Sequence, residues 1–151
     1  MNLYLDTSAL IKRYSIEPGG ADIRVLIQRL NVFATARITY AEMAAAFAKS
    51  VRTGIATKSQ ANHSLVIFQN DWANIYRIEV NELVVNQAAI WAWDFGLRGY
   101  DAVHLSAAFS WQLVLGETVT MATFDKALWT TAKQVGLAVY PVDLPALLTT
   151  W

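Results

Sequence analysis

The sequence predicts an α/β domain in which helices cover both faces of a central parallel sheet. Short apolar runs alternate with longer segments of helical spacing from end to end, which is the pattern of a parallel sheet buried on both faces. Hydrophobic residues make up 55% of the 151 positions and charged residues 16%, so the apolar surface is large enough to offset the entropy lost on folding. The length is that of one domain, and we expect residues 1–151 to form a single unit.

Short apolar runs bounded by turn or capping residues are the strand candidates. They cover residues 3–5, 32–36, 75–78, 119–122 and 137–140. The first run stops at Asp6, a residue type that favours the start of a helix, and the last stops before Pro141, which has no N–H to donate to a strand ladder.

The segments between these runs are expected to be helical. They cover residues 9–14, 21–30, 39–53, 57–72, 81–95, 102–115 and 125–135. Thr39 and Glu42 match a capping box at the start of the alanine-rich third helix. Gly54 and Gly96 follow the third and fifth helices, and glycine is the residue that most often ends a helix.

Composition excludes several classes of protein. Twelve Lys and Arg balance twelve Asp and Glu, which argues against a strongly basic nucleic-acid binder such as a histone. The absence of cysteine excludes a disulfide framework and thiolate chemistry. Asp6 interrupts the N-terminus before a signal sequence develops, and the longest uncharged stretch, residues 102–116, is too short and too polar to span a bilayer. We therefore expect a cytoplasmic protein that is not bound to a membrane.

Four acidic residues fall at the ends of expected elements. They are Asp6 after the first strand, Glu42 in the first turn of a helix, Asp101 at a helix start and Asp125 just after a strand. In open parallel sheets, ligands bind outside the carboxyl ends of the strands, where loops lead into helices. Carboxylates gathered at one place raise one another's pKa unless a cation compensates, and Mg²⁺ or Mn²⁺ prefers carboxylate and water oxygens. The pattern therefore suits a metal site.

The same positions also suit a purely structural role. Asp6 and Asp125 are good N-caps. Glu42 completes the capping box, and Asp101 favours the positive end of a helix. Sequence spacing alone leaves both roles open.

Four segments resemble the motifs of PIN-domain ribonucleases, and they occur in that family's order and spacing. They are Leu5–Lys12 (LDTSALIK), Thr39–Glu42 (TYAE), Leu97–Leu105 (LRGYDAVHL) and Ala122–Leu128 (ATFDKAL). The likeness spans essentially the whole chain and is greatest to the VapC-type toxins of bacterial and archaeal toxin–antitoxin pairs. It implies a three-layer α/β/α PIN-like domain.

The resemblance also implies an activity. The chain would be a metal-dependent endoribonuclease, the toxin component of a toxin–antitoxin pair, which hydrolyses RNA phosphodiester bonds with a metal-activated water. The residues carried over as catalytic groups and as ligands of Mg²⁺ or Mn²⁺ are Asp6, Glu42, Asp101 and Asp125, the last acting directly or through water. Supporting hydroxyls near the metal would come from Thr7, Ser8 and Thr123.

Basic residues that flank the motifs are candidates for contacts with RNA phosphates. They are Lys12, Arg13 and Arg98. Once four carboxylates are assigned to a metal, the twelve basic residues outnumber the remaining acids, which permits an RNA substrate. His104 lies three residues after Asp101 and is expected to be a structural or supporting histidine, whereas His63 is expected to face solvent.

The high apolar and aromatic content predicts surfaces that bind partners. Trp91 and Trp93 lie two positions apart and therefore point to different faces of one helix, one toward the core and one toward an interface. The resemblance implies a homodimer and a VapB-like antitoxin that fills a groove near the metal pocket, giving a heterotetramer or a larger assembly.

Two other interpretations stay open. A PIN-like module that binds RNA or protein without cleaving it would carry the same motifs, and loss of cleavage on Asp6→Asn separates the two. A haloacid-dehalogenase-like phosphatase or a phospho-receiver domain also has an Asp after its first strand. The phosphatase needs a second Asp where this chain has Ser8, and the acidic pair and lysine of a receiver have no match here.

Overall fold

The computed structural model describes residues 1–30 and 32–151. Its strands form one sheet in the order β3-β2-β1-β4-β5, in which every neighbouring pair is parallel. They are β1 (Asn2–Leu5), β2 (Phe33–Ala36), β3 (Tyr76–Ile78), β4 (Val119–Ala122) and β5 (Ala138–Tyr140). Each strand matches its predicted run to within about one residue at either end.

The helices also follow the prediction, with one addition. They are α1 (Thr7–Leu10), the 3₁₀ turn η1 (Ile11–Arg13), α2 (Gly20–Gln28), α3 (Thr39–Arg52), α4 (Lys58–Asp71), the 3₁₀ turn η2 (Trp72–Asn74), α5 (Glu82–Phe95), α6 (Gly99–Leu115), α7 (Lys126–Gln134) and α8 (Leu144–Leu148). The sequence did not predict α8, which Asp143 caps by accepting a hydrogen bond from the N–H of Ala146. Within the described part of the chain, no helix combines the length and apolar character needed to cross a bilayer.

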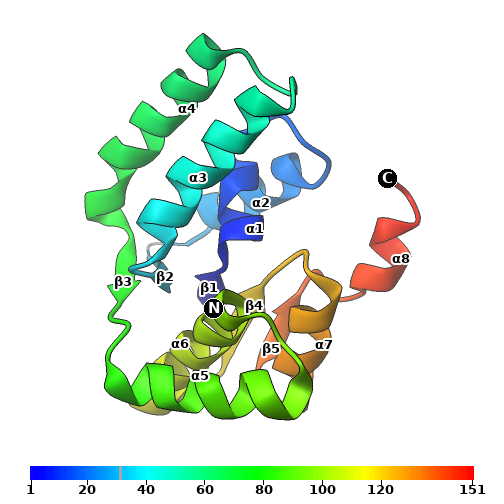
Figure 1. Cartoon of the computed structure of the whole chain (residues 1–151). Helices are drawn as coiled ribbons and strands as arrows, with labels where there is room; N and C mark the ends of the chain where they lie inside the picture. The colour runs from blue at the N-terminus through cyan, green and yellow to red at the C-terminus, as the bar shows by residue number, and fades with distance from the viewer. Residues whose placement is uncertain (31) are drawn as a thin grey trace.

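Two layers of helices cover the sheet (Figure 1). Along β1, Leu3 and Leu5 point into the cluster formed with α1–α4, whereas Tyr4 points into the cluster formed with α5–α7. This alternation follows from the two-residue period of a strand. Helices above and below the sheet confirm the predicted three-layer α/β/α arrangement.

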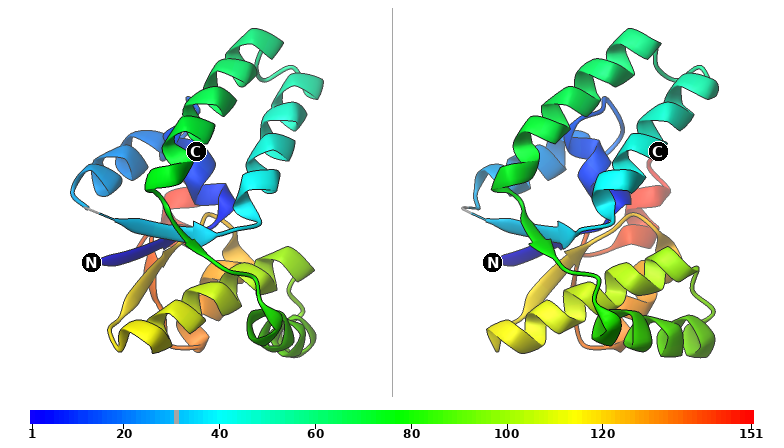
Figure 2. Two further views of the ribbon diagram at one scale, coloured as in Figure 1. Left: turned by 90° about the vertical axis from the view of Figure 1, so that its left-hand side faces the viewer. Right: turned by 60° about the vertical axis from the view of Figure 1, so that its left-hand side comes forward.

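The helices α3 and α4 pack side by side as an antiparallel pair that extends away from the sheet (Figure 2). The capping box predicted for Thr39 and Glu42 at the start of α3 is wrong. Ile38 occupies the N-cap position without a side-chain capping bond, so Thr39 lies inside the first turn, and its hydroxyl is 2.8 Å from that of Thr35. With its hydroxyl engaged there, Thr39 does not cap, and the Glu42 side chain turns toward the end of the sheet. A complete capping box occurs at the start of α4 instead.

The sheet order positions the site. From β1 the chain continues to β2 and β3 on one side and later crosses to β4 and β5 on the other, so the direction of winding reverses between β1 and β4. At such a reversal the loops at the carboxyl ends diverge and leave a crevice. Asp6 directly follows β1, and its N–H donates to the carbonyl of Ala122, the last residue of β4.

Candidate active site

All four predicted acids line one cavity of about 270 Å³ at this crevice. The lining residues are Asp6, Thr7, Ser8, Glu42, Arg98, Asp101, His104, Phe124 and Asp125. Each acid comes from a separate place in the chain, since two follow strands and two lie in the first turns of α3 and α6. The structure therefore brings together residues that are far apart in sequence.

Asp6 is the most deeply buried of the acids, with 3% of its surface exposed. Its Oδ1 accepts hydrogen bonds from the hydroxyl of Ser8 and from the N–H of Ala9, so it also caps α1. Its Oδ2 accepts from the hydroxyl of Thr123 at 2.6 Å. Burial raises the pKa of Asp6, although the hydrogen bonds from Thr123 and Ser8 act in the opposite direction.

Glu42 reaches the cavity from α3 and is held by two donors on one oxygen. The hydroxyl of Thr7 lies 2.8 Å from Oε1, and Nε2 of His104 lies 2.6 Å from the same atom. Partial burial raises the pKa of Glu42, but the hydrogen bonds from His104 and Thr7 act in the opposite direction, and the net effect lowers the pKa. The hydroxyls expected from Thr7, Ser8 and Thr123 therefore contact two of the four acids.

The two histidines lie in different surroundings. His104 is 2% exposed, and its Nδ1 lies 2.7 Å from the hydroxyl of Tyr4. This placement fits the supporting role expected for His104. Its partner Tyr4 was not singled out from the sequence. His63 is exposed on α4, as expected.

Asp101 and Asp125 share one cationic partner, Arg98. The guanidinium lies 2.7 Å from Oδ2 of Asp101 and 3.2 Å from Oδ2 of Asp125, and the Arg98 side chain is 77% exposed. The other oxygen of Asp125 caps α7 by accepting from the N–H of Leu128. Capping and participation in the acidic cluster therefore coexist at Asp125, as they do at Asp6.

Of the three basic residues predicted to contact RNA, only Arg98 lines the cavity. Lys12 contradicts the prediction because it is 6% exposed, donates to the carbonyl of Pro18 and lies over the rings of Phe124 and Trp151. Loop residues and the distant Phe124 and Trp151 surround its ammonium, which the position of a basic residue near a motif does not reveal in sequence. Arg13 forms an ion pair with Asp71 at 3.3 Å, outside the cavity.

The donor set fits a hard divalent cation in kind, since four carboxylates face one small cavity. Within residues 1–30 and 32–151, no three His, Cys, Asp or Glu side chains already lie close enough to share an ion. Arg98 instead occupies one oxygen of each of two carboxylates, Asp101 and Asp125. Among the described residues, Oε2 of Glu42 and Oδ1 of Asp101 accept no protein hydrogen bond, so both remain available as ligands.

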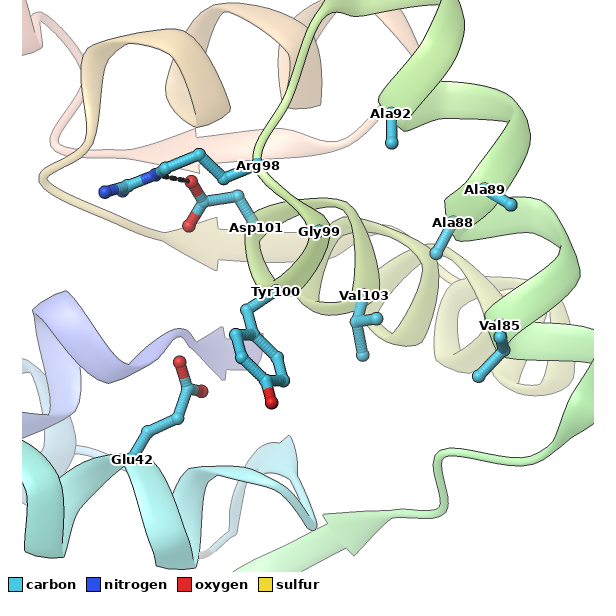
Figure 3. A pocket seen from close by; sticks show the side chains of 10 residues that line it. All are labelled: Glu42, Val85, Ala88, Ala89, Ala92, Arg98, Gly99, Tyr100, Asp101 and Val103. Carbon is cyan, nitrogen blue, oxygen red and sulfur yellow. Dashed lines mark hydrogen bonds and ion pairs between the residues drawn. The ribbon is translucent and has the colours of Figure 1, made fainter.

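An apolar groove of about 590 Å³ opens directly beside the acids. Its apolar walls come from Val85, Ala88, Ala89 and Ala92 on α5 and from Tyr100 and Val103 on α6. Figure 3 shows Glu42 on α3 facing Asp101 and Tyr100 across the opening. Because Glu42, Arg98 and Asp101 line both hollows, an occupant of the groove would lie against the acidic site.

Known proteins resemble this chain along nearly its whole length. It is 30% identical to Ribonuclease VapC45 of Mycobacterium tuberculosis (strain CDC 1551 / Oshkosh) over 143 residues, which cover 94% of this chain and 96% of that protein. The crystal structure of PAE2754 from Pyrobaculum aerophilum matches with a TM-score of 0.67 and 22% identity, over 99% of this chain and 90% of that one. A structure of VapBC2 from Rickettsia felis bound to a DNA fragment matches with a TM-score of 0.62 and 16% identity, over 92% and 97% of the two chains.

The structural matches establish the fold, and the sequence matches establish the family. A family model described as PIN domain matches residues 3–134, which include all four acids and the motifs around them. Together with the identity to Ribonuclease VapC45, this match shows that the chain belongs to the PIN domain family.

Proposed function

We propose that this chain is a metal-dependent endoribonuclease and the toxin of a toxin–antitoxin pair. The observation that carries the proposal is the convergence of four carboxylates on one cavity at the reversal point of a PIN-domain sheet. The relative named as a ribonuclease supports RNA as the substrate, since it aligns with nearly the whole chain.

The cation in this proposal is Mg²⁺ or Mn²⁺. Its ligands are Asp6, Glu42, Asp101 and Asp125, whose oxygens are of the kind that these ions prefer. When bound, the ion supplies a water of lowered pKa as nucleophile and offsets the charge that develops on the scissile phosphate.

The chain's own residues prepare this site and orient the substrate. Thr123 and Ser8 hold Asp6, and Thr7 and His104 hold Glu42, so these two acids keep their places before substrate arrives. Arg98, exposed at the rim, contacts a backbone phosphate once it leaves its carboxylate partners. In-line attack leaves 5′-phosphate and 3′-hydroxyl ends.

The test measures RNA cleavage by the purified chain with Mg²⁺ or Mn²⁺ and with a chelator. Cleavage that requires the ion, leaves the stated ends and disappears in Asp6→Asn and Asp101→Asn supports the proposal. Asp94→Asn is the matched control, because Asp94 is exposed on α5 and does not line the cavity. RNA binding without cleavage would favour a non-catalytic PIN-like module instead.

We also propose a VapB-like antitoxin and self-association as a homodimer. The structure of VapBC2 from Rickettsia felis supports an antitoxin partner. The apolar groove beside the acids fits the apolar side of a partner segment, and a basic side chain from that segment would pair with the carboxylates. Exposed Trp93 and Val114 on α5 and α6 are candidates for the dimer interface. Co-expression with the product of the neighbouring gene, followed by co-purification and inhibition assays, tests the antitoxin.

A further inference from the structure

A buried chain of hydrogen bonds connects the sheet to the acidic site. The hydroxyl of Tyr4 on β1 lies 2.7 Å from Nδ1 of His104 on α6, and Nε2 of the same ring lies 2.6 Å from Oε1 of Glu42 on α3. Tyr4 has no exposed surface, and His104 is 2% exposed. Three elements from distant parts of the sequence thus meet at one imidazole ring.

The partners determine where the protons of this chain lie. An ionised carboxylate only accepts hydrogen bonds, so Nε2 of His104 is the donor to Glu42. Burial raises the pKa of Tyr4 well above its ordinary value, and the charges of Asp6 and Glu42 add to this, so the phenol keeps its proton. A phenol that donates this proton to Nδ1 places the ring proton of His104 on Nε2, the atom that faces Glu42.

The donors to Glu42 act on one oxygen and leave the other available. His104 and Thr7 both donate to Oε1, and among the described residues no donor contacts Oε2. A carboxylate held in this way has lost its rotational freedom before a ligand arrives. One oxygen is satisfied by the protein, and the second lines the cavity.

From this geometry we propose that Tyr4 and His104 form a positioning pair that holds Glu42 so that Oε2 is presented to a divalent cation. The inference rests on the proposed metal-dependent function. His104 is a positioning residue and does not touch the ion. Residues that orient metal ligands from behind typically change metal affinity by about 10- to 100-fold.

The alternative role for the pair is stability alone, and two substitutions at His104 separate the roles. The amide nitrogen of Gln in His104→Gln reaches the position of Nε2 and keeps a donor for Glu42, but it leaves Tyr4 without its acceptor. Asn in His104→Asn keeps a polar atom near Tyr4 but is too short to reach Glu42. A positioning role therefore predicts weaker metal binding in His104→Asn than in His104→Gln. A stability role predicts instead that His104→Gln unfolds at a lower temperature than His104→Asn and that neither variant changes the affinity for metal.

The experiment measures Mn²⁺ affinity by calorimetry on the full-length, RNA-free chain, together with thermal unfolding without metal. We expect about 10- to 100-fold weaker binding in His104→Asn and an intermediate loss in both His104→Gln and Tyr4→Phe, because each of the latter two breaks only the link between Tyr4 and the ring position. If the wild-type chain binds Mn²⁺ and Glu42→Gln weakens binding while both His104 variants bind like wild type, the positioning role is overturned and the proposed function stands. If the wild-type chain binds no Mn²⁺, the metal-dependent function fails and the positioning role fails with it.

A second measurement needs no substitution at the site. Long-range ¹H–¹⁵N spectra of the wild-type chain labelled at histidine report which ring nitrogen carries the proton, and exposed His63 provides an internal reference. We expect His104 to be protonated at Nε2 alone. A signal for a proton on Nδ1 would overturn the proposed direction of the hydrogen-bond chain.

Discussion

Thr123 donates its hydroxyl proton to Oδ2 of Asp6 across 2.6 Å, so the residues that directly follow β4 and β1 are joined side chain to side chain. Both residues are buried. The contact holds the deepest carboxylate of the site where the two halves of the sheet meet. Burial raises the pKa of Asp6 and so disfavours its charged form, whereas the hydrogen bonds to Asp6 favour that form. These two effects on stability can be separated by experiment.

Asp6→Asn is expected to stabilise the metal-free chain. Burial raises the pKa of Asp6 in the folded chain. The contribution of Asp6 to stability is therefore fully present at a pH below its pKa in the unfolded chain, near 3.8, and is lost as the pH rises through its pKa in the folded chain. Asn has no charge to desolvate, so the variant should melt above wild type at pH 7, and the difference should shrink toward pH 4. Thermal unfolding with chelator present measures this, and a variant that melts lower at pH 7 would contradict it.

Glu42→Gln should have the opposite sign. The pKa of Glu42 is lowered in the folded chain. The contribution of Glu42 to stability is therefore present at a pH above its ordinary pKa of 4.5 and is lost as the pH falls through its pKa in the folded chain. Gln still accepts from Thr7 and His104 but lacks the charge that strengthens those bonds. We expect a loss of about 1 kcal/mol at pH 7 that vanishes in acid. Urea unfolding at pH 7 and pH 3 checks it, and an equal loss at both values would disprove the assignment.

The strands and most helices could be predicted because their signals are local. Apolar runs, caps and glycines lie within a few residues of the boundaries that they set. The capping box at Thr39 failed because the competing partner, Thr35, lies on the preceding strand and is reached only through the turn between them. The short helix α8 has no apolar periodicity long enough to detect.

The acids of the site could be predicted, but their partners could not. A carboxylate at the end of a strand or the start of a helix is visible in sequence, and the motifs of a known family identified four such residues. Tyr4 is 100 positions from His104, and no local pattern pairs them. The burial of Lys12 likewise depends on Trp151, which lies at the far end of the sequence.

Lys12→Met is expected to reduce stability without affecting RNA binding. The ammonium donates to the carbonyl of Pro18, pairs with Glu17 and lies over two aromatic rings, so its removal should cost about 2 kcal/mol. Since the amine is buried, the affinity for RNA should stay at the wild-type level. Unfolding and RNA-binding assays at one temperature test both parts, and weaker RNA binding by a folded variant would restore Lys12 as a phosphate contact.

Arg98→Ala is expected to weaken RNA binding through the loss of one phosphate contact. The slope of log affinity against log salt concentration should fall by about one, while stability changes by less than about 1 kcal/mol because the ion pairs are exposed. Arg37→Ala removes a comparable exposed ion pair with Glu79 and serves as the control. An unchanged salt slope in Arg98→Ala, or an equal change in the control, would rule out the contact.

Trp91→Ala and Trp93→Ala should separate core from interface. Trp91 packs against the core and lies edge-on to Phe109 with ring centroids 5.2 Å apart, so its truncation should cost about 2 kcal/mol or more. Trp93 is 89% exposed, and its truncation should change stability by less than about 0.5 kcal/mol while weakening self-association. Unfolding and analytical ultracentrifugation of both variants check this. Self-association that is unaffected by Trp93→Ala would remove this residue from the dimer interface.

The order of the strands has a consequence for a chain that is still being synthesised. Asp6 and Glu42 belong to the first 78 residues, which contain β1, β2 and β3, whereas Asp101 and Asp125 belong to the segment that follows. β4 can pair with β1 only after it has emerged from the ribosome. Until then the cavity lacks the residues of the later segment and has two of its four acids, Asp6 and Glu42. A nascent chain therefore has no complete acidic site until translation has passed Asp125.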